Sequence, residues 1–219
     1  MRARFTLPEI RVKALEIVDR DGLAALNMRS LAGALGTGPM TLYNYVKDRE
    51  GIEALVVEEI IAGVRIPPAS TDWRRDAAAV ATSLWQAVRT HPAAIPLVLT
   101  RRSDLAASFA PAEALITALS RARLTDLDLL AAFRSVLGFV MGAAQGELAG
   151  PLAAQIGELA GRDHPHIGAL AEVSQRSAAE DDFARGLGFL LDGIGARAAA
   201  LESEPACRCA GTNAGQPSV

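Results

Sequence analysis

Between Thr41 and Lys47 the chain carries side chains suited to nucleic-acid recognition. Thr41 and Asn44 can hydrogen-bond to the edges of bases, whereas Tyr43 and Lys47 can reach phosphate oxygens. Arg29, near the start of the preceding segment, can contact the backbone or a guanine edge. Polar side chains of this kind on one side of a short helix are typical of an element that enters the DNA major groove.

Two short helices joined by a glycine corner are predicted to position these side chains. Asn27 can cap a helix over residues 28–35, because its side-chain oxygen can accept hydrogen bonds from the first turn. Gly36 permits a left-handed turn residue. Pro39 suits the start of a second helix over 38–45, where its missing N–H costs little. Such a helix-turn-helix is the arrangement that many proteins use to read DNA.

The rest of the chain is also predicted to be helical, so the expected fold class is all-α. Apolar residues recur at helical spacing, while β-branched runs and aromatic residues are sparse. No alternating run is long enough to indicate a sheet. The further helices are expected over residues 8–21, 48–65, 72–90, 94–100, 104–121, 125–149, 165–174 and 179–201.

A proline-rich segment marks the boundary between two domains. Pro67 and Pro68 end one helix before Asp72 starts the next. The last residues form a polar tail rich in Gly, Pro, Ala and Ser, which we expect to be disordered. The expected parts are a helix-turn-helix DNA-binding domain over 1–50, a linking helix over 48–65, a ligand-binding and dimerisation domain over 72–202, and the tail over 203–219.

Composition and charge narrow the classes of protein to consider. Half of the residues are apolar and 21% are charged, which excludes a disordered chain. Residues 1–50 hold eight Lys/Arg and six Asp/Glu, whereas the remainder holds fourteen and nineteen, so a mildly basic head joins an acidic body. We expect no stretch that approaches a membrane span of about 20 apolar residues and no signal-peptide core. The expected location is therefore the cytoplasm.

The segment MRSLAGALGTGPMTLYNYVKDREGIEAL strongly resembles the TetR family of bacterial transcriptional regulators. It has the family's order of Arg, then Leu-Ala-x-x-Leu-Gly, then Thr-Leu-Tyr-x-Tyr/His-Val/Phe-x-x-Lys/Arg. The resemblance is clear over residues 5–60. It is fainter beyond, where DWRRDAAAVATSLWQAVRTHP and FARGLGFLLDGI resemble the tetracycline-repressor type of ligand domain. The resemblance implies a DNA-binding regulator of transcription.

The pattern and the resemblance together give the candidate DNA-contacting residues. These are Arg29, Thr37, Pro39, Met40, Thr41, Tyr43, Asn44, Tyr45 and Lys47. The stretch Gly38-Pro39-Met40 departs from the family, because some relatives carry longer polar residues there that read bases. Met40 can offer only an apolar contact, for example to a thymine methyl group.

A second subunit is expected, because one short recognition helix gives only modest specificity. Gly138, Gly142 and Gly146 recur every four residues, which indicates close approach of another helix or of a ligand. The resemblance implies that the last long helices form a four-helix interface between subunits, although these helices could also pack within one subunit. The candidate interface residues are Gly138, Gly142, Phe183, Leu187, Leu190, Leu191 and Ile194.

A ligand pocket is expected between the body helices, as in other helical bundles. Apolar residues at helical spacing can equally be core residues. Gln145 is the most informative candidate, because a buried amide beside Met141 needs a ligand or a backbone group as its hydrogen-bonding partner. The candidate lining residues are Trp85, Val88, Phe109, Phe133, Phe139, Met141 and Gln145.

Neither a cofactor nor a metal ion is expected. His164 and His166 flank a proline and make a poor pair for one metal, and Cys207 and Cys209 have no further ligand nearby. Tetracycline repressors use a His after a His-Pro corner to hold a drug-bound magnesium ion, and the resemblance places Val98 at that position. We therefore do not expect a magnesium–tetracycline complex as effector.

Two functions from different classes suit an all-helical chain of this length. The first is a ligand-responsive regulator, most simply a repressor that binds a palindromic double-stranded DNA operator as a homodimer and is released by a small, largely apolar molecule. The second is an all-helical enzyme or cofactor-binding bundle without DNA binding. The sequence has no Glu-x-x-His pair, no plausible Cys–His nucleophile and no Gly-rich phosphate loop. The residues therefore favour the regulator.

Overall fold

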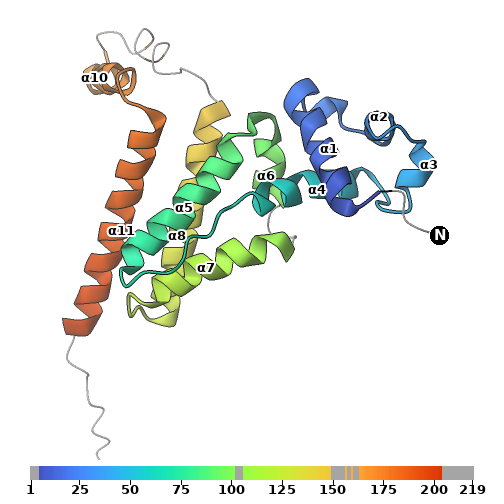
Figure 1. Ribbon diagram of the computed structural model, residues 1–219. Helices are drawn as coiled ribbons and strands as arrows, with labels where there is room; N and C mark the ends of the chain where they lie inside the picture. Colours follow the sequence, from blue (N-terminus) through green and yellow to red (C-terminus); the bar gives the residue numbers. More distant parts are fainter. Residues whose placement is uncertain (1–4, 102–105, 149–155, 157–158, 160–162, 204–219) are drawn as a thin grey trace, which may run out of the picture.

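A computed structural model describes residues 5–101, 106–148, 156, 159 and 163–203, and within these ranges it contains helices and no strand. The all-α prediction is therefore confirmed for the described part of the chain. Figure 1 shows a small group of helices, α1 to α3, at one end, which we call the head. A larger group, which we call the body, holds α5 to α8 and α11, and α4 joins the two.

Side-chain caps determine where the helices of the head begin. At α1, Thr6 and Glu9 form a reciprocal capping box in which Glu9 Oε2 accepts from Thr6 N at 2.7 Å. At α2 the predicted cap is confirmed, because Asn27 Oδ1 accepts from two backbone N–H groups at 3.0 Å. At α4, Asp48 Oδ1 accepts from Gly51 N at 2.8 Å. The head and linking helices are α1 (Leu7–Asp21), α2 (Met28–Ala34), α3 (Pro39–Leu42) and α4 (Arg49–Ala62).

The second helix of the corner is shorter than predicted. Gly36 has a φ of +63°, so it makes the expected left-handed corner, but α3 ends at Leu42 rather than near residue 45. After Leu42 the backbone tightens into three-residue turns, in which Tyr45 N donates to Leu42 O at 2.8 Å and Asn44 N donates to Thr41 O at 3.4 Å. The polar residues of the corner therefore lie on one helical turn and the tight turns after it.

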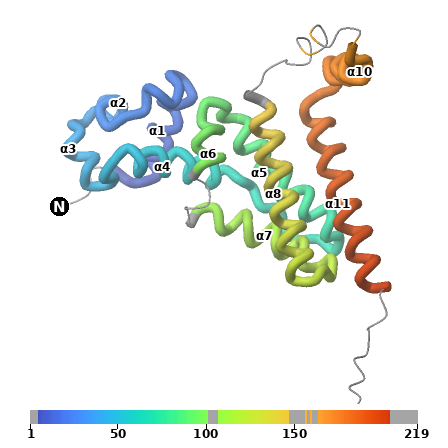
Figure 2. Tube along the Cα trace, turned by 180° about the vertical axis from the view of Figure 1, so that it is seen from behind, coloured from blue at the N-terminus to red at the C-terminus, as the bar shows by residue number. Residues whose placement is uncertain are grey.

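The body is a bundle with its core between α5, α7, α8 and α11. The helix α5 packs against α7 and α8, and α11 contacts both α5 and α8. Trp85 of α5 stacks on Phe183 of α11, with ring centroids 4.2 Å apart. Figure 2 shows α8 and α11 side by side, on the side of the body away from the head. The body helices are α5 (Trp73–Arg89), α6 (Ile95–Arg101), α7 (Phe109–Ser120), α8 (Asp126–Leu148) and α11 (Ala179–Ser203), and α10 (Pro165–Ser174) precedes α11 in the chain.

A buried carboxylate fixes the proline-rich linker to the body. Asp76 of α5 accepts hydrogen bonds from Ser70 N at 2.8 Å and from Ser70 Oγ at 2.7 Å. It also accepts from the guanidinium of Arg121, at the end of α7. The hydrogen bond from Arg121, followed by that from Ser70, lowers the pKa of Asp76 to about 2. Ser70, which follows the predicted boundary at Pro67 and Pro68, is thus fixed to the body.

Candidate DNA-reading helix and ligand pocket

The corner between α2 and α3 projects from the far end of the head (Figure 1). Leu42 is 0% exposed and holds the inner side of α3 against the head, as its spacing requires. On the outer side Met40 is 77% exposed and Tyr43 is 49% exposed. Asn44 is exposed as well. The corner therefore buries Leu42 as its single anchor and exposes Met40, Tyr43 and Asn44 to solvent.

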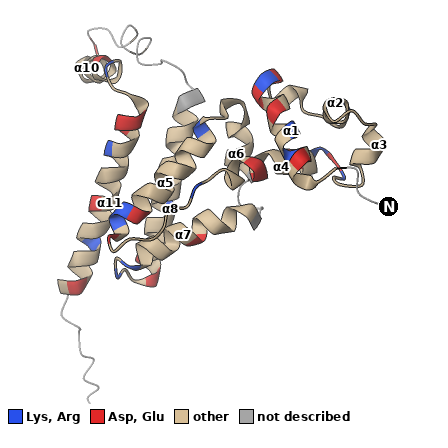
Figure 3. Ribbon diagram, viewed as in Figure 1, with Lys and Arg blue, Asp and Glu red and all other residues tan. Residues whose placement is uncertain are grey.

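The remaining candidates differ in how accessible they are. Arg29, Pro39 and Lys47 are exposed, and Thr41 is half-buried. Figure 3 shows that α3 itself carries no charged side chain. The positive charge for a phosphate contact must therefore come from flanking residues such as Arg29 and Lys47.

Two candidates use their polar groups differently from the expectation. Tyr45 is predicted to face outward, but it is half-buried and packs against the core. Its hydroxyl accepts a hydrogen bond from Phe5 N at 3.2 Å. The hydroxyl oxygen of Thr37 is buried and has no hydrogen-bond partner among the described residues. Tyr45 therefore fastens the segment before α1 to the end of the corner.

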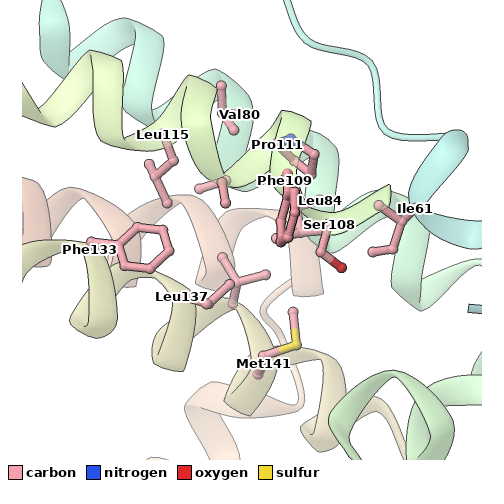
Figure 4. A pocket seen from close by; sticks show the side chains of 13 residues that line it. Ile61, Val80, Leu84, Ser108, Phe109, Pro111, Leu115, Phe133, Leu137 and Met141 are labelled. Carbon is pink, nitrogen blue, oxygen red and sulfur yellow. The ribbon is translucent and has the colours of Figure 1, made fainter. Parts of the chain in front are cut away.

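The body contains a cavity of about 280 Å³ between α5, α7 and α8 (Figure 4). Of the predicted lining residues, Phe109, Phe133 and Met141 line it. Phe109 lies at its rim, because 68% of this residue is exposed. The full lining is Ile61, Val80, Ala81, Leu84, Ser108, Phe109, Pro111, Ala112, Leu115, Phe133, Leu137, Val140 and Met141.

The other predicted lining residues do not line this cavity. Trp85 and Val88 are buried but face away from the cavity, and Trp85 stacks on Phe183 instead. Phe139 lies against α11, with its ring 5.3 Å from that of Phe183. Gln145 is exposed, so its amide needs no buried partner. The sequence located the correct helices but not their rotation about their own axes.

The cavity is chemically uniform. Apart from the hydroxyl of Ser108, all of its lining side chains are apolar, and none carries a charge among the residues that the structure describes. A charged ligand would lose its hydration there without gaining a partner. Ile61 differs from the other lining residues because it belongs to α4, the helix that leads to the head. A ligand in this cavity would thus touch both the body and the helix that joins it to the head.

The predicted subunit interface is largely wrong at the level of residues. Phe183, Leu187, Leu191 and Ile194 are each no more than 9% exposed, because they face the core of their own chain. Leu190 is half-buried and packs against the same core.

The glycines of α8 face solvent instead. Gly138 and Gly142 are exposed, and a Cβ added at either would meet no heavy atom of the described chain within 4 Å. Large apolar side chains are exposed on α8 and α11 as well, with Leu127 of α8 at 81% and Phe189 of α11 at 72%. The outer face of α8 therefore has both open space and uncovered apolar surface.

The same helix also corrects the expectation that no stretch approaches a membrane span. The segment Asp126–Gly146 of α8 spans 21 residues and contains an 18-residue window with a mean hydropathy of 1.6, so it is long and apolar enough to cross a membrane by composition alone. In this structure the segment is a body helix with one face packed against α5 and α7. Its apolar character is thus used in part for the core of the body.

The histidines and cysteines do not assemble a metal site in the described part of the chain. No group of three His, Cys, Asp or Glu side chains is close enough there to hold a metal ion. His91 contacts the carboxylate of Asp19, with Nδ1 2.8 Å from Oδ2. Val98 is buried in the core and does not line the cavity. The cysteines Cys207 and Cys209 lie outside the described residues.

Comparison with known proteins agrees with this architecture. Residues 66–198 match the family model described as "Tetracyclin repressor-like, C-terminal domain". The chain is 32% identical over 144 residues to an HTH-type transcriptional regulator of Saccharopolyspora erythraea, covering 65% of this chain and 61% of that protein. It is 30% identical over 146 residues to the HTH-type transcriptional repressor DrrR1 of Streptomyces coeruleorubidus, covering 66% of this chain and 54% of that protein. The match thus spans little more than half the length of these relatives.

Among solved structures, apo ActR from Streptomyces coelicolor is similar over nearly the whole chain. Its TM-score is 0.79 at 25% identity, covering 92% of this chain and 100% of ActR. The complex of ActR with actinorhodin has a TM-score of 0.76 at 25% identity, covering 88% of this chain and 96% of that one. The arrangement of a helix-turn-helix head on a helical body is therefore shared by both proteins.

Proposed function

Because this chain belongs to the TetR family of transcriptional regulators, we propose that it binds a palindromic operator as a homodimer and releases it when a small, uncharged, apolar molecule enters the body. The named relatives are regulators of transcription and not enzymes, and the same holds for this chain. The alternative of a helical enzyme or cofactor-binding bundle is therefore set aside. The expected site of action is the cytoplasm, where a bacterial operator lies.

The observation that carries the proposal is the outward side of the α2–α3 corner. Leu42 is fully buried while Met40, Tyr43 and Asn44 face solvent at the end of the head. In this arrangement Asn44 and Thr41 reach base edges, Met40 contacts a thymine methyl group, and Lys47 and Arg29 contact phosphates. Pro39 and Tyr43 lie beside them and contact the DNA backbone, while Thr37 and Tyr45 support the corner from within.

A second copy of the chain binds the second half-site of the operator. The exposed glycines of α8 leave room for a helix to approach closely, and Phe189 of α11 offers an apolar side chain to cover. Helices α8 and α11 lie on the side of the body away from the head (Figure 2), so a partner that covers them leaves the head uncovered. We therefore assign the interface to the outer face of α8 and α11, with Leu127, Gly138, Gly142 and Phe189 replacing the buried leucines of the sequence-based prediction.

The cavity supports the ligand part of the proposal. Its apolar lining suits an uncharged molecule, and two phenyl rings, those of Phe109 and Phe133, suit one with an aromatic system (Figure 4). ActR, which shares the fold, binds actinorhodin, and DrrR1 is a repressor, so release of a repressed operator by such a ligand is the simplest mode of action. Coupling between ligand and operator is expected at about 1–3 kcal/mol, as in other allosteric proteins.

The proposal is tested by selecting preferred duplexes from a random DNA pool with the purified chain. We expect a sequence with two-fold symmetry, bound by two chains per duplex, whose log affinity falls linearly with log salt concentration. A shuffled duplex of equal length and composition is the matched control. Equal affinity for both duplexes at all salt concentrations, or no binding at low salt, would refute operator binding.

A further inference from the structure

A hollow of about 250 Å³, which we call the arginine hollow, lies between the start of α5, the end of α7 and the end of α11. Figure 1 shows these helix ends together at the end of the body farther from the head. None of its lining residues lines the apolar cavity, so the two are separate features. The lining carries three positive charges and one negative charge, which favours an anion there. Its members are Trp73, Arg74, Arg121, Ala122, Arg123, Gly195, Ala198, Ala199 and Glu202.

Arg74 is the arginine of the hollow that has no acidic partner. Its guanidinium carbon lies 4.6 Å from the centroid of the Trp73 ring, and it forms no ion pair with any residue in the part of the chain that the structure describes. Its side-chain N–H groups remain available, because an aromatic face does not occupy them as a carboxylate would. Arg74 can therefore donate to an oxyanion without giving up an existing ion pair.

A glycine of α11 makes room for this guanidinium. A Cβ at Gly195 would lie 1.6 Å from Nη2 and 2.6 Å from Cζ of Arg74, so any other residue at this position would displace the Arg74 side chain. Gly195 is buried, and glycine in a helix interior is less favourable than alanine. The helix thus carries a residue that does not favour it at the place where Arg74 lies against its backbone.

The other two arginines are also held at the hollow. Arg121 donates to the carboxylate of Asp76 and to the backbone oxygen of Ser70, which fixes its orientation. Arg123 has a φ of +57°, an unfavourable backbone for a residue with a long side chain, whereas Asn or Gly adopts it readily. Arg123 Nη1 lies 3.3 Å from Glu202 Oε1, but these side chains are 81% and 56% exposed. Such a contact is weak, so a ligand can replace Glu202 beside Arg123.

We propose that the arginine hollow binds a small organic anion that carries a phosphate or carboxylate group. The guanidinium groups of Arg74 and Arg123 donate paired hydrogen bonds to its oxygens, and Arg121 adds a fixed positive charge beside them. The alanines of the lining and the half-buried Trp73 contact the apolar part of the molecule. The chain then has two ligand sites of opposite chemistry, because the cavity between α5, α7 and α8 disfavours charge.

The test is calorimetric titration of the full chain with phenyl phosphate and with benzoate at constant ionic strength. Tighter binding of phenyl phosphate would assign the site to phosphate monoesters, and tighter binding of benzoate would assign it to carboxylates. Arg74→Ala should weaken binding of the preferred probe by about tenfold, through loss of charged hydrogen bonds. Arg75→Ala is the matched control, because Arg75 is exposed on the same turn of α5 and does not line the hollow, so it should bind as the parent does.

Two further variants separate loss of binding from loss of folding. Gly195→Ala keeps every charge but displaces the guanidinium of Arg74, so it should weaken binding about as much as Arg74→Ala does. Its unfolding temperature should not fall, because the displaced atoms are the end of a flexible side chain and alanine favours the helix. Arg123→Asn should also weaken binding without lowering the unfolding temperature, because Asn tolerates the left-handed backbone.

Equal affinities of Arg74→Ala and Arg75→Ala would overturn the inference, as would the absence of binding of both probes to the parent chain. Lys47→Ala, in the head, should bind the probes as the parent does, and a loss of affinity there would place the anion on the operator surface instead. A chain that binds the probes but no duplex would refute the proposed function and leave the anion site standing.

Discussion

Gly186 of α11 lies directly against the ring of Phe139 of α8. A Cβ at Gly186 would lie 2.7 Å from Cζ and 2.8 Å from Cε2 of Phe139. The Phe139 ring cannot move away freely, because it lies 5.3 Å from the Phe183 ring, which in turn stacks on Trp85 at 4.2 Å. We therefore predict that Gly186→Ala destabilises the fold.

The magnitude follows from two opposing terms. Forcing an extra methyl group into a packed core typically costs about 1–3 kcal/mol. Alanine in place of glycine in a helix interior stabilises by about 1 kcal/mol, which offsets part of that cost. The net effect should be a loss of about 1 kcal/mol, or a fall of about 2–4 °C in the midpoint of thermal unfolding for a chain of this size.

Gly33→Ala is the matched control for this prediction. Gly33 lies in α2, is exposed, and has no atom within 4 Å of the added Cβ. Gly33→Ala should therefore raise the free energy of unfolding by up to about 1 kcal/mol, through the higher helix propensity of alanine alone. The difference in the free energy of unfolding between the two variants gives the cost of packing the added methyl group against Phe139. It is measured by calorimetry and by urea titration. If Gly186→Ala were as stable as Gly33→Ala, the described packing of Phe139 against α11 would be wrong.

The remaining predictions concern the linker, the corner and the interface. The pKa of Asp76 is about 2 in the folded state and about 4 when unfolded, so its contribution to stability is complete above pH 4 and is lost as the pH falls through 2. The gap in unfolding temperature between the natural chain and Asp76→Asn should accordingly narrow between about pH 4 and pH 2, and a constant gap would argue against the charged pair with Arg121. Lys47→Ala should weaken binding to all duplexes alike and reduce the slope of log affinity against log salt by about 1. Asn44→Ala should weaken binding by about 1–3 kcal/mol on the preferred duplex only. The same effect from both variants would invalidate the assignment of roles. Phe189→Asp should shift the sedimentation of the chain from dimer to monomer without lowering its helix content, and an unchanged dimer would place the interface elsewhere.

Local chemistry made the head predictable from the sequence. Asn27 caps α2, Gly36 has the left-handed backbone, and Leu42 is the single buried anchor of α3, each as its position in the pattern requires. These features depend on neighbours only a few residues away. The early end of α3 could not be predicted, because nothing local in the residues after Leu42 forbids a helix and the tighter turns form only in the folded head.

The body was predictable only at the level of its helices. Phe133 and Met141 line the cavity while Phe139, on the same helix, packs on α11, because the helix presents successive residues about 100° apart. Their apolar character is the same, so composition could not assign them to a cavity or to a core. On α5 the residues that line the cavity include Val80 and Leu84, which are four residues apart and share one face, and neither is among the predicted lining residues.

The broad apolar face of α11 had a similar ambiguity. Leu187 and Leu191 are buried in their own chain, while Phe189 between them is exposed at 72%. Part of a wide apolar stripe is buried in the core of its own subunit. Only the residues of the stripe that remain exposed can contact a second subunit. The sequence shows how wide the stripe is, but only the packing of α5 and α8 decides which edge of it stays free.

The most direct test of the central claim is a cross-link from the outer side of α3 to DNA. Met40, which is 77% exposed, is replaced by p-benzoylphenylalanine, and the chain is irradiated with its selected duplex. The account predicts cross-links to bases within each half-site, and none from the same group placed at the exposed Glu113 of α7. Cross-links from Glu113 with none from Met40 would contradict it, because the DNA would then be bound by the body rather than by the corner of the head.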